Sequence, residues 1–501
     1  MLNGLKRVFI VFIGLLLQFG FSFAIAFYFS EKVGIITFFY KVLSFLIVLG
    51  IIKDSVRLSR DLPWIIIILM FPLFGTLLRI TYGRNYSKSR LLKEIKYYEK
   101  EYIDYLKQDT NIYKDVEEKH LDNINYLINR SKYVVSVNND IDYYNFGEKF
   151  YPELISELKK AKKFIFMEYF IISKGYMWDS ILEILKEKAK LGVEVRVLYD
   201  DIGSVSVLST SYPKYLKSFG IKAIPFNRIS PFRGMFMNNR DHRKITVIDG
   251  KVAFSGGVNI SDEYINKKSR FGVWKDNGIK IKGDGVWNLT VMFLSLWNAI
   301  TKEDDDILKF KHNFKDNNIK KGYVLPYGIG PTRRDLIGED VYINIINSSK
   351  KYLYITTPYL IIDTDMLNSL TRAAKRGVDV RIIVPGIPDK IVAYHQTSSF
   401  FKILHESGVK IYKYKNGFIH SKVFLSDDIR SVVGTINMDY RSLYLHFENG
   451  IYMEGVKVLK DIKEDFIETI HSSSRISNKD IEVSFFKNIY YSILRLLAPL
   501  F

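Results

Sequence analysis

The chain has 501 residues, which is too long for one ordinary domain and suggests about three structural units. Its hydrophobic fraction of 48% and aromatic fraction of 15% can form sizeable cores, so a disordered chain is not expected. The net charge of +19 favours a polyanionic partner, either nucleic acid or an anionic membrane surface. The absence of cysteine excludes disulfides, thiolate metal sites and a cysteine nucleophile.

Three apolar stretches occupy the first 80 residues: Val8–Phe29, Val33–Ile52 and Pro63–Leu78. The first two are long enough to cross a ~30 Å hydrocarbon core, and the third is borderline. A cleaved signal peptide is the alternative for the first stretch, and a buried or interfacial helix for the third. We therefore predict a membrane-spanning region of two or three helices in residues 1–80. The distribution of Lys and Arg around the stretches predicts that the large C-terminal part is cytoplasmic.

Residues 81–132 are charged and rich in Lys, Glu and Tyr, which predicts a solvated helical linker. From about residue 133 the chain repeats itself, with a first half at 133–325 and a second half at 326–484. The final segment, 485–501, is apolar and aromatic with sparse Lys and Arg. It is typical of an interfacial segment, although a helix packed on the catalytic core fits equally well.

The two halves match element by element. Strand-type runs at 164–171 and 352–359 are followed by helical stretches at 178–191 and 366–376, then by Val- and Ile-rich strands at 192–199 and 377–384. The first copy has a loop ten residues longer around Arg228–Asp241. Alternating strands and helices predict an α/β fold with a mainly parallel or mixed sheet. Two such halves suggest a pseudo-twofold axis that brings their motifs into one cleft.

Both halves contain the pattern H-x-K-x4-D-x6-G-[GT]-x-N. The first copy consists of His242, Lys244, Asp249, Gly256, Gly257 and Asn259, and the second of His420, Lys422, Asp427, Gly434, Thr435 and Asn437. One copy of so loose a pattern could arise by chance, whereas two copies with every fixed position kept are very unlikely to. The two copies supply two imidazoles, two ammonium groups and two amides, which is what phosphoryl transfer needs in a site without metal.

A phosphodiester resists attack because its anionic oxygens repel nucleophiles, so catalysis needs neutralised charge, a positioned nucleophile and a proton for the leaving oxygen. Lys244 and Lys422 can clamp the phosphate oxygens. Asn259 and Asn437 can add neutral donors, as can the backbone at 256–257 and 434–435. One histidine can attack phosphorus while the other protonates the leaving alkoxide. A carboxylate can fix each imidazole tautomer, and the candidates are Asp276 and Glu448.

Each residue also has a purely structural interpretation. Asp249 and Asp427 are more easily explained as stabilising turns than as taking part in the chemistry. The two asparagines could cap helices, and the glycines could serve close backbone packing. The eight histidines show no zinc-binding spacing, so we expect neither a metal nor another cofactor.

The double motif is the signature of the phospholipase D superfamily. With Asn239-Arg240-Asp241 before the first motif and Phe447-Glu448-Asn449 after the second, the chain resembles bacterial cardiolipin synthases. The resemblance implies transfer of a phosphatidyl group from one phosphatidylglycerol to another through a phosphohistidine, with release of glycerol. His242 would be the nucleophile and His420 the acid and base. The resemblance also implies a multi-pass protein of the bacterial cell membrane, with anionic lipid and not nucleic acid as its partner.

Three alternatives remain open. A phospholipase D would use water in place of the lipid alcohol, and another phosphatidyltransferase would use a different lipid pair. A membrane-tethered nuclease would cleave nucleic-acid phosphodiesters with the same motif. A lipid-binding scaffold with a dead site would carry one broken motif, but both motifs are intact. The donor and acceptor lipids, the acyl preference and the oligomeric state are not determined by these motifs.

Overall fold

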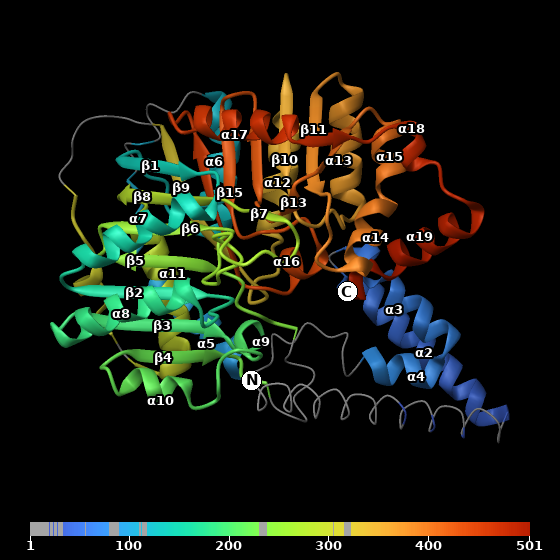
Figure 1. The fold of residues 1–501 in the computed structure, drawn as a ribbon. Helices are drawn as coiled ribbons and strands as arrows, with labels where there is room; N and C mark the ends of the chain where they lie inside the picture. The colour runs from blue at the N-terminus through green and yellow to red at the C-terminus, as the bar shows by residue number, and fades with distance from the viewer. Residues whose placement is uncertain are drawn as a thin grey trace.

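The fold was analysed in a computed structural model (Figure 1). It describes residues 34–55, 57–79, 90–109, 118–229, 238–303, 305–314 and 322–500, together with residues 20, 24, 28 and 112. Two α/β halves lie side by side, and each is built on one mixed sheet. The predicted duplicated α/β unit is therefore confirmed.

The first half has a seven-stranded sheet in which β2, β3 and β4 are parallel and the other pairings are antiparallel. In spatial order its strands are β1 (Asn139–Tyr144), β8 (Gly278–Gly283), β6 (Val252–Gly256), β5 (Lys244–Ile248), β2 (Phe164–Tyr169), β3 (Glu194–Asp200) and β4 (Lys222–Phe226). Its helices are α7 (Gly147–Lys160), α8 (Tyr176–Lys190), α9 (Asp201–Ser204), α10 (Tyr212–Lys217) and α11 (Val286–Thr301).

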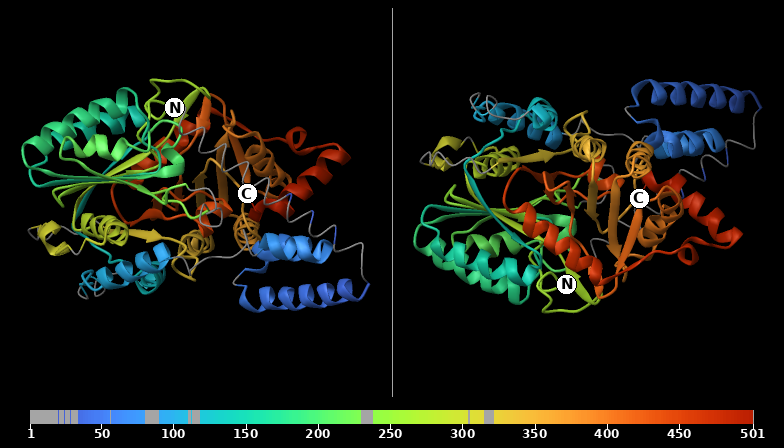
Figure 2. Two further views of the ribbon diagram at one scale, coloured as in Figure 1. Left: turned by 90° about the horizontal axis from the view of Figure 1, so that it is seen from below. Right: turned by 90° about the horizontal axis from the view of Figure 1, so that it is seen from above.

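Strand β2 is buried on both faces because helices cover each side of the sheet (Figure 2). Successive side chains of a strand point to opposite faces. Phe164 and Phe166 accordingly pack in one core with α11, whereas Ile165 and Met167 pack in a second core with α8. This explains why the strand is apolar on both faces from Phe164 to Met167 and does not alternate there.

The second half repeats this strand order in an eight-stranded sheet with one strand added at its edge. In spatial order its strands are β9 (Tyr323–Ile329), β16 (Glu448–Glu454), β15 (Arg430–Gly434), β14 (Val423–Ser426), β10 (Tyr352–Thr356), β11 (Asp379–Pro385), β12 (Lys410–Tyr414) and β17 (Ser473–Arg475). Its helices are α12 (Ile337–Ser348), α13 (Thr364–Lys375), α14 (Ile391–Ser399), α15 (Phe401–Glu406), α16 (Tyr440–Tyr444), α17 (Leu459–His471), α18 (Asn478–Ile481) and α19 (Phe485–Leu497).

Two short stretches of backbone pairing join the halves near the repeated motif of each. Strands β7 (Val273–Lys275) and β13 (Gly417–Ile419) form a two-stranded parallel sheet across the boundary. An isolated bridge pairs Asp241 with Phe447. Each connection lies directly before a motif histidine, so the boundary between the halves determines where those imidazoles sit.

Within the proposed linker at 81–132, the structure describes α5 (Arg90–Ile103) and α6 (Glu118–Ser131). Its helices are not simply solvated, however. Leu92, Ile95, Tyr98 and Tyr102 recur every three or four residues and are buried in the large core. This apolar stripe is short and interrupted by charged residues, so the charged composition of the segment did not reveal it.

The prediction of transmembrane helices is wrong for the described part of the chain. None of the helices that the structure describes is long and apolar enough to cross a membrane. The stretch 63–78 is divided at Phe71 and Pro72 between α3 (Leu58–Met70) and α4 (Pro72–Leu78), each far shorter than the ~20 residues a span needs. Helix α2 (Gly34–Asp54) packs Val48 against α3. The stretch 8–29 lies outside the described residues, apart from residues 20, 24 and 28.

The prediction of a multi-pass protein with a cytoplasmic catalytic part is overturned by the same finding. The described N-terminal helices lie beside the second half, close to α19 (Figure 1). Arg57 fixes them there through ion pairs with Asp365 and Asp340, at 2.5 and 3.2 Å. The predicted domain boundaries at residues 81, 133, 326 and 485 stay a proposal. Strand β1 is the first strand of the first half, and strand β9 is the first strand of the second.

Asp249 and Asp427 occupy equivalent turns in the two halves. Each has a positive φ, +55° and +57°, and each carboxylate accepts three backbone N–H bonds of 2.7–2.9 Å from the residues that lead into the central strand of its sheet. The donors are Lys162, Lys163 and Phe164 in the first half and Lys350, Lys351 and Tyr352 in the second. These contacts support a structural role for both carboxylates.

We expect Asp249→Ala to lower the free energy of unfolding by about 2–4 kcal/mol, because three backbone donors lose their acceptor. Asp249→Asn keeps one acceptor and tolerates positive φ, so its loss should be about half as large. Chemical denaturation of both variants checks this. Unchanged stability combined with lost activity in Asp249→Ala would instead assign this carboxylate to the chemistry.

Candidate functional site

The two motif histidines are held by matching backbone bonds across the boundary between the halves. The N–H of His242 donates to the carbonyl of Phe447 at 2.8 Å, and the N–H of His420 donates to the carbonyl of Lys275 at 2.7 Å. In both cases the acceptor directly precedes a carboxylate residue in the sequence. The two imidazoles are close enough for the charge of His420 to act on the pKa of His242.

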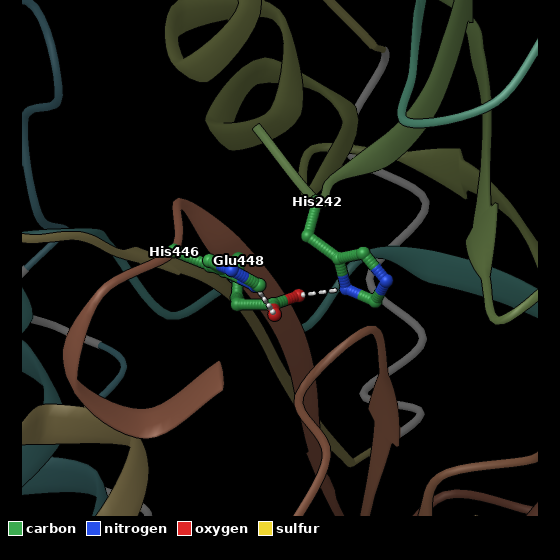
Figure 3. A group of neighbouring side chains, drawn as sticks. All are labelled: His242, His446 and Glu448. Atoms are coloured by element: carbon green, nitrogen blue, oxygen red, sulfur yellow. Dashed lines mark hydrogen bonds and ion pairs between the residues drawn. The ribbon is translucent and has the colours of Figure 1, made fainter. Parts of the chain in front are cut away.

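Each histidine is bonded to a carboxylate of the opposite half. Nδ1 of His242 lies 2.9 Å from Oε2 of Glu448 (Figure 3), and Nδ1 of His420 lies 2.6 Å from Oδ2 of Asp276. Both carboxylates are fully buried. A carboxylate on Nδ1 favours the tautomer with its hydrogen there, which leaves the lone pair of Nε2 available for reaction. Sequence suggested both carboxylates without assigning each to its histidine.

The two carboxylates are supported differently. Glu448 accepts hydrogen bonds from the hydroxyls of Thr435 at 2.5 Å and Ser442 at 2.6 Å. Asp276 accepts from the backbone N–H of Asn277 at 2.9 Å. Gly257 corresponds to Thr435, and a Cβ atom there would overlap the Asp276 carboxylate. The Gly/Thr difference between the motifs therefore matches a difference in how each carboxylate is held.

The two motif lysines point back toward the histidines that precede them. Nζ of Lys244 donates to the carbonyl of His242 at 2.7 Å, and Nζ of Lys422 donates to the carbonyl of His420. Burial lowers the pKa of Lys244 to about 7, against the opposing effect of Glu448. Burial likewise lowers the pKa of Lys422 to about 8, against Asp276. A buried lysine loses hydration that stabilises its charge, so an anion arriving beside it is strongly favoured.

The pKa values of both histidines are also lowered. Burial, followed by the charge of Lys422, lowers the pKa of His420 to about 4, although Asp276 opposes this. Burial, followed by Lys244 and Lys422, holds the pKa of His242 well below its ordinary value. The exposed fractions are only 8% for His242 and 7% for His420. Both imidazoles are consequently neutral near pH 7, as a nucleophile or a general base must be.

The two motif asparagines differ in availability. The side chain of Asn259 accepts from the backbone of Ile171 at 3.0 Å and donates to the hydroxyl of Tyr264 at 2.7 Å. Oδ1 of Asn437 is buried without a hydrogen-bond partner among the described residues. The side chain of Asn437 is thus less engaged within the protein than that of Asn259, in which both the oxygen and the Nδ2 group are bonded.

The backbone N–H groups of the glycine positions are engaged within the protein. Those of Gly257 and Thr435 donate to the carbonyls of Asn277 and Asn449, both at 2.9 Å, and that of Gly434 donates to the carbonyl of Lys422 at 3.3 Å. The sequence suggested that these N–H groups could bind a phosphate, but these bonds leave them unavailable for that role. Gly256 has φ of +135°, and a Cβ there would overlap the backbone of Asn277. Close packing of strands is therefore the role we propose for these glycines.

Asp249 and Asp427 lie at the far ends of β5 and β14 from the histidines. Each aspartate lies seven positions after its histidine. Because an extended chain rises about 3.3 Å per residue, the two side chains of each pair are separated by roughly 20 Å along the strand. Aromatic rings border the imidazoles instead. The ring of Phe170 lies 4.9 Å from that of His242, and the rings of Tyr264 and Trp274 each lie 5.4 Å from that of His420.

Two further features were not found from the sequence. The Arg240 guanidinium binds the buried Asp200 carboxylate at 2.7–3.0 Å, and the backbone N–H of Asp241 donates to the same carboxylate, which fixes the segment before His242. The positive charge of Lys390, at the start of α14, acts on the pKa of His242. Arg240 stood in a quoted motif, but neither Asp200 nor Lys390 carries any sequence signal that links it to the site.

A third histidine, His446, was also missed. Its ring centroid lies 5.7 Å from that of His242, and its Nδ1 lies 3.7 Å from Oε1 of Glu448 (Figure 3). The potential ligand atoms of His242, His446 and Glu448 all lie within 4.8 Å of one another. This spacing could accommodate a metal ion. However, both Glu448 oxygens already accept hydrogen bonds, so we interpret the group as a network that orients His242.

Comparison with known proteins places this geometry in a family. Residues 154–280 and 342–470 match the family model described as "Cardiolipin synthase, PLD-like domain". The chain is 34% identical to a cardiolipin synthase of Halalkalibacterium halodurans, over 88% of this chain and 89% of that one. It is 35% identical to a cardiolipin synthase of Clostridium perfringens (strain SM101), over 87% and 93%.

The fold has a counterpart among solved structures. The phosphatidylserine synthase of Haemophilus influenzae superposes with a TM-score of 0.53 at 15% identity, covering 73% of this chain and 95% of that one. At this identity the similarity supports the fold alone. The matches to the family model and to the relatives are stronger, and they show that the chain belongs to the cardiolipin synthase family of the phospholipase D superfamily.

Proposed function

We propose that the protein is a cardiolipin synthase that transfers a phosphatidyl group from one phosphatidylglycerol to another and releases glycerol. The observation that carries the proposal is the reciprocal pairing of His242 with Glu448 and His420 with Asp276 between two buried lysines. Two imidazoles with free Nε2 atoms suit a double displacement at phosphorus. Family membership supports the choice of phospholipid as substrate.

In the first half-reaction, Nε2 of His242 attacks phosphorus. The bond from phosphorus to the glycerol oxygen breaks, and His420 gives this oxygen its proton. Lys244, Lys422 and Asn437 would neutralise or bind the phosphate oxygens as charge shifts in the transition state. The products are free glycerol and a phosphatidyl group covalently bound to His242.

In the second half-reaction, neutral His420 takes the proton of a primary hydroxyl on the second phosphatidylglycerol. The resulting oxygen attacks phosphorus, the bond to His242 breaks, and cardiolipin leaves. His420 releases this proton when cardiolipin leaves and takes up another when the next phosphodiester binds. One phosphodiester is broken and one is formed, so the energy of the bond is conserved without a nucleotide.

His242 is the better nucleophile of the two because three hydrogen bonds fix its partner Glu448. That carboxylate offsets the positive charge that imidazole acquires when it bonds to phosphorus. Brief reaction of His420→Ala with lipid radiolabelled in its phosphatidyl group, followed by quenching in alkaline detergent, in which a phosphohistidine is stable, should leave label on His242. Label on His420 in His242→Ala would reverse the assignment.

The reaction itself can be tested with purified protein in phosphatidylglycerol micelles without added metal or nucleotide. We expect cardiolipin and glycerol in equal amounts, and His242→Ala should lower the rate by at least about 10³-fold because the covalent route is lost. Phosphatidic acid with glycerol but no cardiolipin would indicate a hydrolase. No turnover would contradict the proposed lipid pair.

A matched pair of variants tests the support of Glu448. Thr435→Val keeps the shape of the side chain but removes the hydroxyl that donates to Glu448 at 2.5 Å. We expect kcat to fall roughly 10- to 100-fold, because a lost bond to a buried charged group is worth ~1.5–3 kcal/mol. Thr435→Ser retains the hydroxyl and should stay within about threefold of the parent protein. Equal losses in both variants would mean that methyl packing, not hydrogen bonding, matters at this position.

The pH profile tests the charge of the buried lysines. Lys244 has a pKa of about 7, so its ammonium form is lost as the pH rises through that value. The free protein then loses attraction for the phosphate, and kcat/KM should decline between about pH 7 and 9. Protonation of His242 removes the nucleophile, so kcat/KM should fall at the acid end, well below the ordinary pKa of histidine because burial lowers the pKa of His242. A kcat/KM that rises from pH 7 to pH 9 would contradict the proposed clamp.

A further inference from the structure

A second basic cavity lies away from the histidines, beneath the C-terminal helix. Its volume is about 210 Å³, and its walls come from α14, α15, β12 and the segment from α18 to α19. The cationic side chains in its lining are Lys402, Lys413, Lys487 and Arg495. Its one carboxylate, Asp480, lies 3.5 Å from Lys413 and also accepts hydrogen bonds from Ser477.

The remaining cations of this cavity are poorly neutralised. Lys402 has Glu406 at 4.0 Å on the exposed surface of α15. Within the part of the chain that the structure describes, Lys487 and Arg495 have no ion-pair partner. Arg495 is partly buried and Lys487 is exposed. A cavity lined by four cations and a single engaged carboxylate is complementary to an anion with several oxygen atoms, such as phosphate.

Helix α19, which forms one wall of the cavity, has two distinct faces. Its cavity side carries Lys487, Tyr491 and Arg495, and Tyr491 and Leu494 are its buried residues. The opposite side presents large apolar residues to solvent. Their exposed fractions are 73% for Phe485, 81% for Phe486, 44% for Ile489 and 48% for Ile493. A helix with this division suits a position in the plane of a membrane interface.

Helix α14 packs against α19 and opens with two exposed apolar residues. Ile391 and Val392, which open this helix, are 69% and 45% exposed. Lys390 directly precedes them and is close enough to His242 to act on its pKa. Helix α14 has nine residues and so is ~14 Å long, and its later residues line the basic cavity. Helix α14 therefore connects the basic cavity, which its later residues line, with Lys390 at its start, whose charge acts on His242.

We propose that this cavity binds the phosphate headgroup of an anionic phospholipid in the bilayer, while Phe485, Phe486 and Ile391 enter the boundary between headgroups and acyl chains. The bound lipid is not the substrate. It positions α19 and α14 so that the catalytic centre faces the membrane surface from which substrate is drawn. The positive lining selects anionic lipid, and the apolar stripe selects a bilayer over free phosphate.

The test measures flotation with lipid vesicles made of phosphatidylcholine and phosphatidylglycerol at a 7:3 ratio. Every protein carries His242→Ala, so that vesicle composition stays constant and the result is independent of the proposed reaction. The cavity variant combines Lys402→Gln, Lys487→Gln and Arg495→Gln. Each cation near an anionic surface contributes roughly fivefold in affinity, so we expect a loss on the order of 10- to 100-fold.

The matched control removes the same charge elsewhere, through Lys190→Gln, Lys214→Gln and Lys217→Gln. These exposed lysines lie at the end of α8 and on α10, on the far side of the first half from α19 (Figure 1). The control should lose less than about threefold in affinity, and thermal unfolding should confirm that both variants are folded. Equal losses of vesicle affinity in the two triple variants would overturn the proposal that the cavity binds lipid and would leave only general electrostatic attraction.

A second variant tests the apolar part of the surface. Phe485→Ser with Phe486→Ser should lower vesicle binding about tenfold or more at high salt, where electrostatic attraction is screened. Unchanged binding by this variant would overturn the proposed contact of α19 with the bilayer. Equal binding of the parent protein to pure phosphatidylcholine vesicles would overturn the selection of an anionic headgroup.

Discussion

The exchange of carboxylates between the halves is the interaction on which the site depends. His242 of the first half requires Glu448 of the second, and His420 of the second half requires Asp276 of the first. Both carboxylates are fully buried, and a buried carboxylate without its partner carries a large desolvation penalty. Separation of the halves would therefore stop the chemistry and, at the same time, leave both carboxylates without their partners. This dependence explains why the backbone bonds across the boundary lie directly beside the reacting groups.

The two halves share their strand order, but they differ in how they hold the two catalytic carboxylates. Glu448 is held by two side-chain hydroxyls, whereas Asp276 is held by a backbone N–H and is packed against Gly257. A double displacement needs one permanent nucleophile and one group that alternates between acid and base. Similar histidines can take these unlike roles because their carboxylates differ in hydrogen bonding, which alters how readily each imidazole carries positive charge.

Much of the catalytic architecture could be predicted because the motif and the strands and helices around it occur twice in the sequence. The repeated motifs and matching strand and helix signals predicted the duplicated α/β unit, and both carboxylates were named as candidates. Their pairing could not be predicted, since His242 and Glu448 are 206 residues apart and His420 and Asp276 are 144 apart. His446 and Lys390 likewise join the site only through folding. For the third apolar stretch, 63–78, the membrane prediction failed because apolar length was counted across Pro72, where the structure changes helix.

Charge balance links the resting site to the reaction. Two lysines and two carboxylates give a group that is close to neutral while both imidazoles are uncharged. A phosphodiester adds one negative charge to this buried group, and uptake of one proton by an imidazole restores neutrality. That proton is the one that the leaving glycerol oxygen requires. The lowered pKa values of the free histidines therefore do not oppose acid catalysis, because substrate binding itself raises the proton affinity of the site at the moment when a proton is needed.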